Sequence, residues 1–302
     1  MTRSEIARTL SLALASLTSL AAVAQDSAAA DAAKPPYTLT GHVDVVSRYV
    51  LRGVTSTYGN GAPPLGNKGA DAPESNRPAL QWGVDWVHES GLYLGYFGST
   101  INYSYKQLGK SYADRGITDF QKDKSIENDF YGGYTFGVGD FTFNVGATGY
   151  VYINGEAANA LESKLAATWG PVTLSAQTPF NDTVWGNRGD TYWALTFTKP
   201  LPYDFTFTAS LGYYTYEKEG KYLGTTDTLA GTACGAGEAF VVNGCFAGKG
   251  PSSGGWRHLI LGVSQPIGST GFVWGAQAIF GGENRFGVDQ GDRFVATLSY
   301  VF

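Results

Sequence analysis

Charged side chains at alternate positions of several segments are the residues of this chain best suited to chemistry. If the segments are β-strands, these charges face away from the apolar side chains, because side chains of a strand alternate between two faces. Rings of such charges set ion preference in membrane pores. The candidates to line a lumen are Asp44, Arg48, Arg52, Asp85, Glu127, Asp129, Glu162, Lys164, Arg257 and Arg293.

Two functions for these charges stay open. Arg48 and Arg52 would lie ~13 Å apart on one face of a strand from Tyr37 to Leu51, where they would shape the field of an open pore for small polar solutes. Opposite charges could instead pair and plug a narrow lumen, since small barrels are filled by their own side chains. A plugged barrel would serve a structural role or bind ligands through its external loops.

The elements that must position these charges are about twelve extended segments with period-two patterning. In the second segment, for example, Leu80, Trp82 and Val84 alternate with Gln81 and Gly83. Most segments have 9 to 14 residues, the length of tilted membrane-spanning strands (~9–11) rather than of ordinary strands (~5–6). The segments are 37–51, 79–89, 92–103, 126–136, 141–152, 160–169, 172–180, 191–198, 205–216, 257–265, 272–280 and 292–302.

The connections between the segments alternate between long and short. Those at 89–91, 137–140, 169–171, 199–204 and 266–271 are short, and most of the others are long. Outer-membrane barrels have an even number of strands, short periplasmic turns and longer external loops. Lipid requires a spanning sheet to close on itself, so the first strand should pair with the last. The sequence therefore predicts a closed antiparallel transmembrane β-barrel with both termini on the periplasmic side.

Composition agrees with an exported membrane protein. Arg3 and Arg8, an apolar stretch from Leu10 to Ala21 and a small-residue site at 22–24 predict a signal peptide over residues 1–24. Residues 25–36 would be a flexible periplasmic linker and 37–302 the barrel. Of 21 basic and 26 acidic residues, 19 and 25 would remain after cleavage, and this mildly acidic balance argues against nucleic acid as a partner.

Cys234 and Cys245 are the only cysteines and lie within the longest connection. An exported chain passes through an oxidising compartment, where disulfides form and persist. A disulfide between them would close a twelve-residue loop and stabilise it by ~2–3 kcal/mol on the chain-entropy model. A metal pair or two free thiols are the alternatives, although no histidine of the loop completes a zinc site.

Catalytic chemistry has little support. A hydrolase needs a serine and a histidine in hydrogen-bond contact, with a third group that orients the histidine. Ser264 would lie roughly 20 Å along a strand from His258, so these two cannot share a proton. An outer-membrane hydrolase stays as a further alternative. No catalytic residue, cofactor or metal site is predicted.

The final segment has an apolar face that includes Leu298, Tyr300 and Phe302, with Thr297 and Ser299 on the other face. It resembles the closing strand of outer-membrane barrels, which would make it the signal read by the barrel-assembly machinery. Three other stretches resemble the same kind of protein. The first contains LTG at 39–41 and RGVT at 52–55, the second contains GVD at 83–85 and HESGLY at 88–93, and the third is DFYGGY at 129–134.

Together these stretches resemble the proteobacterial outer-membrane porin family of the TorF type, long catalogued as the Gcw_chp conserved proteins. The resemblance covers most of the mature chain and is more specific in its first half. It implies an outer-membrane barrel with a transport role, in contact with lipid and with a small polar solute. It brings no catalytic motif, and the loop from Glu217 to Trp256 is longer than the family leads one to expect.

Overall fold

The computed structural model describes residues 35–55, 77–247 and 250–302. The predicted signal peptide, 1–24, and all but the last two residues of the predicted linker, 25–36, lie outside this set. The helices found among the described residues are too short or too polar to span a bilayer.

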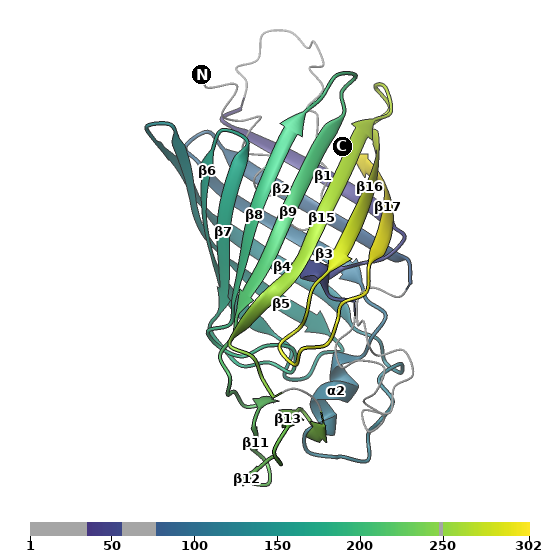
Figure 1. Cartoon of the computed structure of the whole chain (residues 1–302). Coiled ribbons are helices and arrows are strands. Elements are labelled where there is room, and N and C mark those ends of the chain that lie inside the picture. The colour runs from purple at the N-terminus through teal and green to yellow at the C-terminus, as the bar shows by residue number, and fades with distance from the viewer. Residues whose placement is uncertain (1–34, 56–76, 248–249) are drawn as a thin grey trace.

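Twelve long strands of the described residues close into one antiparallel barrel (Figure 1). The order around the wall is β1-β17-β16-β15-β9-β8-β7-β6-β5-β4-β3-β2. The strands are β1 (Tyr37–Val46), β2 (Ala79–His88), β3 (Leu92–Thr100), β4 (Ile126–Val138), β5 (Phe141–Ile153), β6 (Ala160–Trp169), β7 (Val172–Pro179), β8 (Thr191–Pro200), β9 (Thr206–Thr215), β15 (Gly254–Pro266), β16 (Phe272–Gly281) and β17 (Arg293–Val301). The predicted closed barrel is confirmed, and so is the pairing of first and last strands, with Val45 opposite Leu298.

Period-two patterning sorts the side chains of the wall as the sequence predicts. On β8, Trp193 and Leu195 are exposed on the outer face, whereas Tyr192 and Ala194 are buried on the inner face. The closing strand follows the same rule, with Phe294 and Leu298 exposed. Exposed large apolar residues occur on the outer face of every strand of the barrel, so the outside of the barrel wall is apolar.

The connections also separate by end of the barrel. Short turns join β2 to β3, β4 to β5, β6 to β7, β8 to β9 and β15 to β16 at the end where the C-terminus lies (Figure 1). The long connections extend from the opposite end and carry the helix α2 (Tyr105–Ser111). We call these two ends the short-turn end and the long-loop end.

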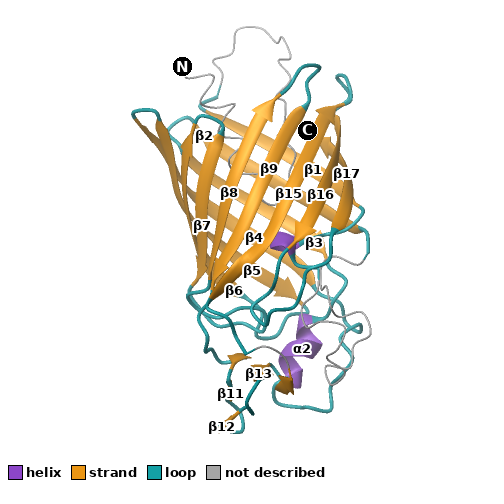
Figure 2. Cartoon of the chain, viewed as in Figure 1, coloured by secondary structure: helices purple, strands orange, loops and turns teal. Residues whose placement is uncertain are grey.

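The first strand is shorter than predicted. The sequence predicts a strand to Leu51, but β1 ends at Val46 and a 3-10 helix, η1, spans Leu51–Gly53. Arg52 has a left-handed backbone conformation (φ 50°) and Gly53 a positive φ of 72°, so the chain cannot continue as a strand. The prediction that Arg48 and Arg52 share one strand face is therefore wrong. We call residues 47–55 the inward turn, and Figure 2 shows its short purple helix within the outline of the barrel.

The long connections form a compact cap at their end of the barrel. The connection between β9 and β15 contains one sheet of β10 (Leu223–Gly224), β13 (Glu238–Val241) and β14 (Gly244–Ala247), and a second of β11 (Thr226–Asp227) and β12 (Thr232–Ala233). A buried apolar cluster joins this connection to the others, and includes Tyr103, Leu108, Phe120 and Val242. The cap is thus packed on a core of its own.

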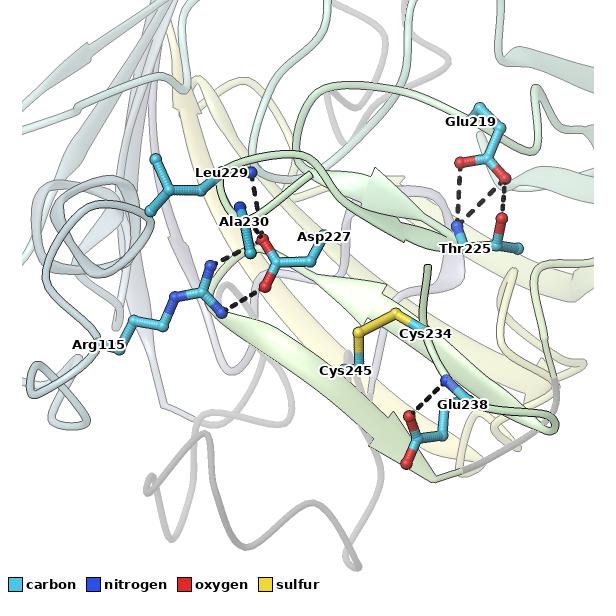
Figure 3. Close-up of a disulfide and its surroundings, with 10 residues drawn as sticks. Arg115, Glu219, Thr225, Asp227, Leu229, Ala230, Cys234, Glu238 and Cys245 are labelled. Carbon is cyan, nitrogen blue, oxygen red and sulfur yellow. Dashed lines mark hydrogen bonds and ion pairs between the residues drawn. A yellow bond between two sulfur atoms is a disulfide. The ribbon is translucent and has the colours of Figure 1, made fainter. Parts of the chain in front are cut away.

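Cys234 and Cys245 form the predicted disulfide within the cap, with their Cα atoms 5.5 Å apart (Figure 3). Beside it, Arg115 donates two hydrogen bonds to Asp227 of β11, Nη1 to Oδ2 at 2.7 Å and Nη2 to Oδ1 at 2.8 Å. The arginine follows α2 and the aspartate precedes the disulfide, so this ion pair ties two long connections together.

Candidate functional site

The strand register brings most of the predicted charges to the inner face of the barrel. Inner positions pair across neighbouring strands, as Glu127 does with Tyr152 and Glu162 does with Thr148. Side chains directly opposite each other in a sheet lie on the same face. The register places Asp44, Asp85, Glu127, Asp129, Glu162, Lys164 and Arg293 on the inner face in this way.

The inward turn is anchored to two of these carboxylates. The Tyr49 hydroxyl donates to Glu127 Oε1 at 2.5 Å. Three residues further on, Arg52 donates from Nη1 and Nη2 to the two carboxylate oxygens of Glu162, at 2.9 and 2.5 Å. Because both acceptors lie on the inner face of the wall, these bonds hold the turn inside the barrel.

Arg52 is further enclosed by tyrosines of the wall. It donates to the Tyr150 hydroxyl at 3.1 Å and to the Tyr214 hydroxyl at 3.4 Å. Its guanidinium also lies over the Tyr192 ring, 4.9 Å from the centroid. A guanidinium has five donors and stacks well on aromatic rings, so this environment suits arginine better than lysine. The arginine thereby connects the turn to β5, β6, β8 and β9.

A bulge in β15 directs two consecutive side chains into the barrel. The register with β9 shifts between Trp256 and His258, and an extra residue of this kind re-aims a side chain. Arg257 and His258 are both buried as a result. Arg257 Nε donates to the backbone oxygen of Arg52 at 3.3 Å, and the His258 Nε2 lies 2.7 Å from the Tyr192 hydroxyl.

Of the other predicted lumen residues, Asp129 is buried beside this cluster, opposite Tyr150 on the inner face. The remaining five form no hydrogen bond or ion pair with it in the described structure. Asp44 pairs with His42 at 2.7 Å, and Asp85 accepts a hydrogen bond from Tyr131 at 2.6 Å. Lys164 is partly exposed, one step along the inner face from Glu162. Arg293 begins β17 and donates to the backbone of Asp292. Arg48 is partly exposed beyond the end of β1, whereas Arg52 is buried.

The two ends of the lumen differ in packing. Toward the long-loop end, Gln81, Ser99, Glu127 and Glu162 are at most 1% exposed, and the inward turn contacts the last two. Toward the short-turn end, the inner face of several strands has small polar residues that are partly exposed. They are Thr168, Thr173, Thr196, Thr208, Ser210, Ser264 and Gln277. The lumen is therefore narrow and packed at one end and lined with accessible polar groups toward the other.

A cavity of about 120 Å³ lies where the inward turn, the wall and the long connections meet. We call it the outer cavity. Its charged lining residues are Arg52, Glu162, Asp190, Arg257 and Arg285. Seven aromatic residues also line it, Tyr105, Tyr150, Tyr152, Trp185, Tyr214, Tyr216 and Phe286. Arg285 and Asp190, from two different connections, form an ion pair at its edge.

None of the three histidines lies in a Ser-His-acid arrangement among the described contacts. His42 contacts Asp44, and His258 contacts Tyr192. His88 Nδ1 lies 2.9 Å from Ser90 Oγ in an exposed short turn. The described residues contain no group of three or more His, Cys, Asp or Glu arranged to hold a metal ion.

Several residues of the site escaped the sequence analysis. Tyr49 looked like an outward residue because the apolar alternation of the first strand continues through it. Strand alternation could have assigned Tyr192 and Tyr214 to the inner face. Tyr192 lies on the same face of β8 as Ala194, and Tyr214 lies on the same face of β9 as Gly212 and Ser210. Arg285 and Asp190 lie outside the strands, where no periodicity assigns a direction.

Residues 67–250 match the family model described as "Bacterial protein of unknown function (Gcw_chp)". The chain belongs to the Gcw_chp family. This confirms the Gcw_chp part of the resemblance stated from the sequence, whereas the TorF-type porin name stays a prediction. A comparison with curated proteins found no match.

Several solved structures are similar in outline to this Gcw_chp protein. For the KdgM porin, the identity is 8%, the TM-score is 0.47, and the match covers 87% of this chain and 99% of that one. For the NanC porin, the identity is 10%, the TM-score is 0.45, and the match covers 87% of this chain and 98% of that one. For the outer membrane phospholipase A from Escherichia coli, the identity is 13%, the TM-score is 0.36, and the match covers 87% of this chain and 91% of that one. Because these TM-scores are below 0.5, the barrel fold rests on the strand order described above, and these likenesses assign no activity.

Proposed function

We propose that this Gcw_chp protein is a channel of the Gram-negative outer membrane that admits small polar or charged solutes. The proposal is based on the difference in polarity between the outer and inner faces of the closed barrel wall. The outer face has exposed leucine, phenylalanine and tryptophan, and the inner face has charges, threonine and serine. An apolar outer face suits acyl chains, and a polar inner face suits a water-filled path.

Lipid contact explains why the wall is closed and why the outer residues are apolar. A spanning sheet without free edges leaves no backbone group unpaired in hydrocarbon. Short turns and termini would lie in the periplasm, and the cap would face the outside. Export would depend on the predicted signal peptide. Insertion would depend on the barrel-assembly machinery reading the strand that carries Leu298, Tyr300 and Phe302.

The inward turn would be the selective part of the path. A solute entering from outside would reach the outer cavity, pass the Arg52–Glu162 pair, and then meet Lys164 and the hydroxyl-lined wall. Charges inside a narrow, weakly screened passage act strongly on ions. We therefore assign the field of the channel to Arg52, Glu162 and Lys164, and a TorF-type transport role to the whole barrel.

A second function is favoured by the packing at the long-loop end. The buried pairs of the inward turn and the apolar cluster of the cap would suit a plugged barrel that binds ligands through its external loops. The partly exposed hydroxyls beyond Lys164 favour the channel, because a permanently plugged barrel gains nothing from an accessible polar lining.

Swelling of liposomes separates the two functions. Purified protein would be reconstituted into liposomes loaded with an impermeant polymer and diluted into isotonic arabinose, glycine or potassium gluconate. The channel predicts swelling with at least one of these solutes above that of protein-free liposomes. An absence of swelling with all three, from vesicles in which the barrel is folded, would contradict the channel and favour the plugged barrel.

A further inference from the structure

The charged residues that line the outer cavity are three buried arginines and two buried carboxylates. Two further carboxylates, Glu127 and Asp129 of β4, are buried nearby but do not line the cavity. Arg52 pairs with Glu162, and Arg285 pairs with Asp190. Among the described residues, no carboxylate lies within ion-pairing distance of the fifth charged residue, Arg257. Burying an unpaired charge costs several kcal/mol in typical proteins, so an anion placed against Arg257 would stabilise that side of the cavity.

The contacts of Arg257 point to the same conclusion. Its side chain is 6% exposed and makes a single described hydrogen bond, from Nε to the Arg52 backbone oxygen at 3.3 Å. Nη1 is buried without a hydrogen-bond partner. The Tyr214 ring, with its centroid 5.7 Å from the guanidinium carbon, offers a partial substitute for an anion. The guanidinium therefore keeps free donor capacity inside the cavity.

The two paired arginines also keep donors available. Arg52 Nε and Arg285 Nη1 are buried without hydrogen-bond partners. Three guanidinium groups with free N–H groups thus border one cavity. Arginine binds carboxylates through two parallel hydrogen bonds, which gives both affinity and orientation.

The walls of the cavity restrict the rest of the ligand. The Trp185 indole nitrogen donates to the Ala158 oxygen at 2.7 Å, so its remaining contact surface is the apolar ring. The hydroxyls of Tyr150 and Tyr152 are bound to Glu162 and Glu127. Aromatic rings pack well against other flat rings. The volume of about 120 Å³ is below the 300–1,000 Å³ typical of drug-sized ligands, so the ligand must be small.

We propose that the outer cavity binds a small organic carboxylate that carries one flat ring, with its carboxylate on Arg257. The proposal rests on the proposed function only in making this ligand a solute of the channel. Binding itself requires no conduction. A site with one unpaired guanidinium would discriminate against a neutral ligand of the same shape, because the buried charge would then stay unpaired.

The test is binding of benzoate to the folded, detergent-purified protein, measured by calorimetry and by Trp fluorescence, with benzyl alcohol as the neutral analogue. Wild-type protein should bind benzoate, and bind benzyl alcohol about tenfold or more weakly. Arg257→Gln should weaken benzoate binding about tenfold or more while leaving benzyl alcohol unchanged. Arg188→Gln, at an exposed arginine outside the cavity, is the matched control and should bind as wild type does.

Equal affinity of wild-type protein for benzoate and benzyl alcohol, or no binding of benzoate, would overturn the proposal even if Arg257→Gln fails to fold. Full benzoate affinity in a folded Arg257→Gln variant would overturn it as well. The channel can fail independently of this site. Benzoate binding without liposome swelling would support the site and contradict the channel. Swelling without benzoate binding would support the channel and contradict the site.

Discussion

Arg52 and Glu162 are 110 residues apart in the chain and form a two-point ion pair inside the barrel, with N–O distances of 2.9 and 2.5 Å. Their side chains are 5% and 1% exposed. Removing one partner of such a buried pair typically destabilises a protein by about 3–5 kcal/mol, because the remaining charge is uncompensated. The pair therefore fixes the inward turn against β6 and narrows the lumen at that level.

The inward turn also depends on a glycine. A Cβ atom on Gly53 would lie 2.7 Å from the Cβ of His258, and the φ of 72° is unfavourable for other residues. Gly53→Ala should displace the turn from His258 and increase solute flux in the liposome assay. Gly170→Ala is the matched control, since it shares a positive φ of 56° but has no atom within 4 Å of the added Cβ. Both variants bear a backbone penalty of about 1–2 kcal/mol, so equal flux in the two would contradict the predicted role of the turn.

The disulfide should stabilise the cap and leave the barrel unaffected. Replacing Cys234 and Cys245 together by serine removes a constraint worth ~2–3 kcal/mol on the chain-entropy model. Cleavage of the connection by proteinase K, on the folded barrel, should accelerate by about tenfold to a hundredfold. The shift in gel mobility on boiling should stay the same. Loss of that shift would show that the disulfide supports the barrel itself.

The Arg115–Asp227 pair predicts a pH dependence of the cap (Figure 3). The hydrogen bonds from Arg115 hold the pKa of the Asp227 carboxyl below its usual value. A carboxyl with a lowered folded-state pKa contributes stability that is present above its unfolded pKa of about 3.9 and lost as the pH falls through the folded value. Protease resistance of the cap should therefore fall below about pH 4, as followed with pepsin.

Arg115→Ala provides the check on that assignment. The variant should show weaker protease resistance at neutral pH and a smaller further loss on acidification. Lys122→Ala, at an exposed lysine of the same connection, should behave as wild type. An identical acid response in wild type and Arg115→Ala would show that another group controls the stability of the cap.

The apolar outer face predicts unequal effects of two similar substitutions. Leu165 in the middle of β6 is 53% exposed, and Leu229 in the cap is 50% exposed. Leu165→Arg should destabilise the barrel in lipid vesicles by about 2–4 kcal/mol, because it places a charge in hydrocarbon. Leu229→Arg should have little effect, since it lies in water. Urea unfolding in vesicles measures both, and equal stability of the two variants would refute lipid contact at Leu165.

The strands were predictable because the alternation of apolar and polar side chains involves only neighbouring residues of the sequence. Each strand of the wall has one apolar outer face and one polar inner face. Adjacent residues such as Trp193 and Ala194 therefore indicate which side chains point outward. The twelve strands and their closure follow from that alternation together with the alternating lengths of the connections. The same local pattern misplaced the end of β1, where Tyr49 and Leu51 continue the alternation although the chain has turned inward.

The site was only partly predictable because its contacts are distant in the sequence. The charges of the inner face were assigned from strand phase, but nothing near Arg52 indicates that its partner is Glu162. Gly53 was the one local signal of a turn, since a positive φ favours glycine. Arg285 and Asp190 meet across two irregular connections, where side-chain direction depends on packing rather than on periodicity.

Single-channel recording in planar bilayers tests the central claim most directly, with wild-type protein, Arg52→Ala and the exposed control Arg188→Ala. The account predicts current steps for wild type and the control. It predicts larger steps for Arg52→Ala, because the inward turn is no longer held against β6. It also predicts a reversal potential shifted toward cations, because Glu162 stays in the lumen without its positive partner. Absence of current in all three proteins, or an unchanged reversal potential for Arg52→Ala, would contradict it.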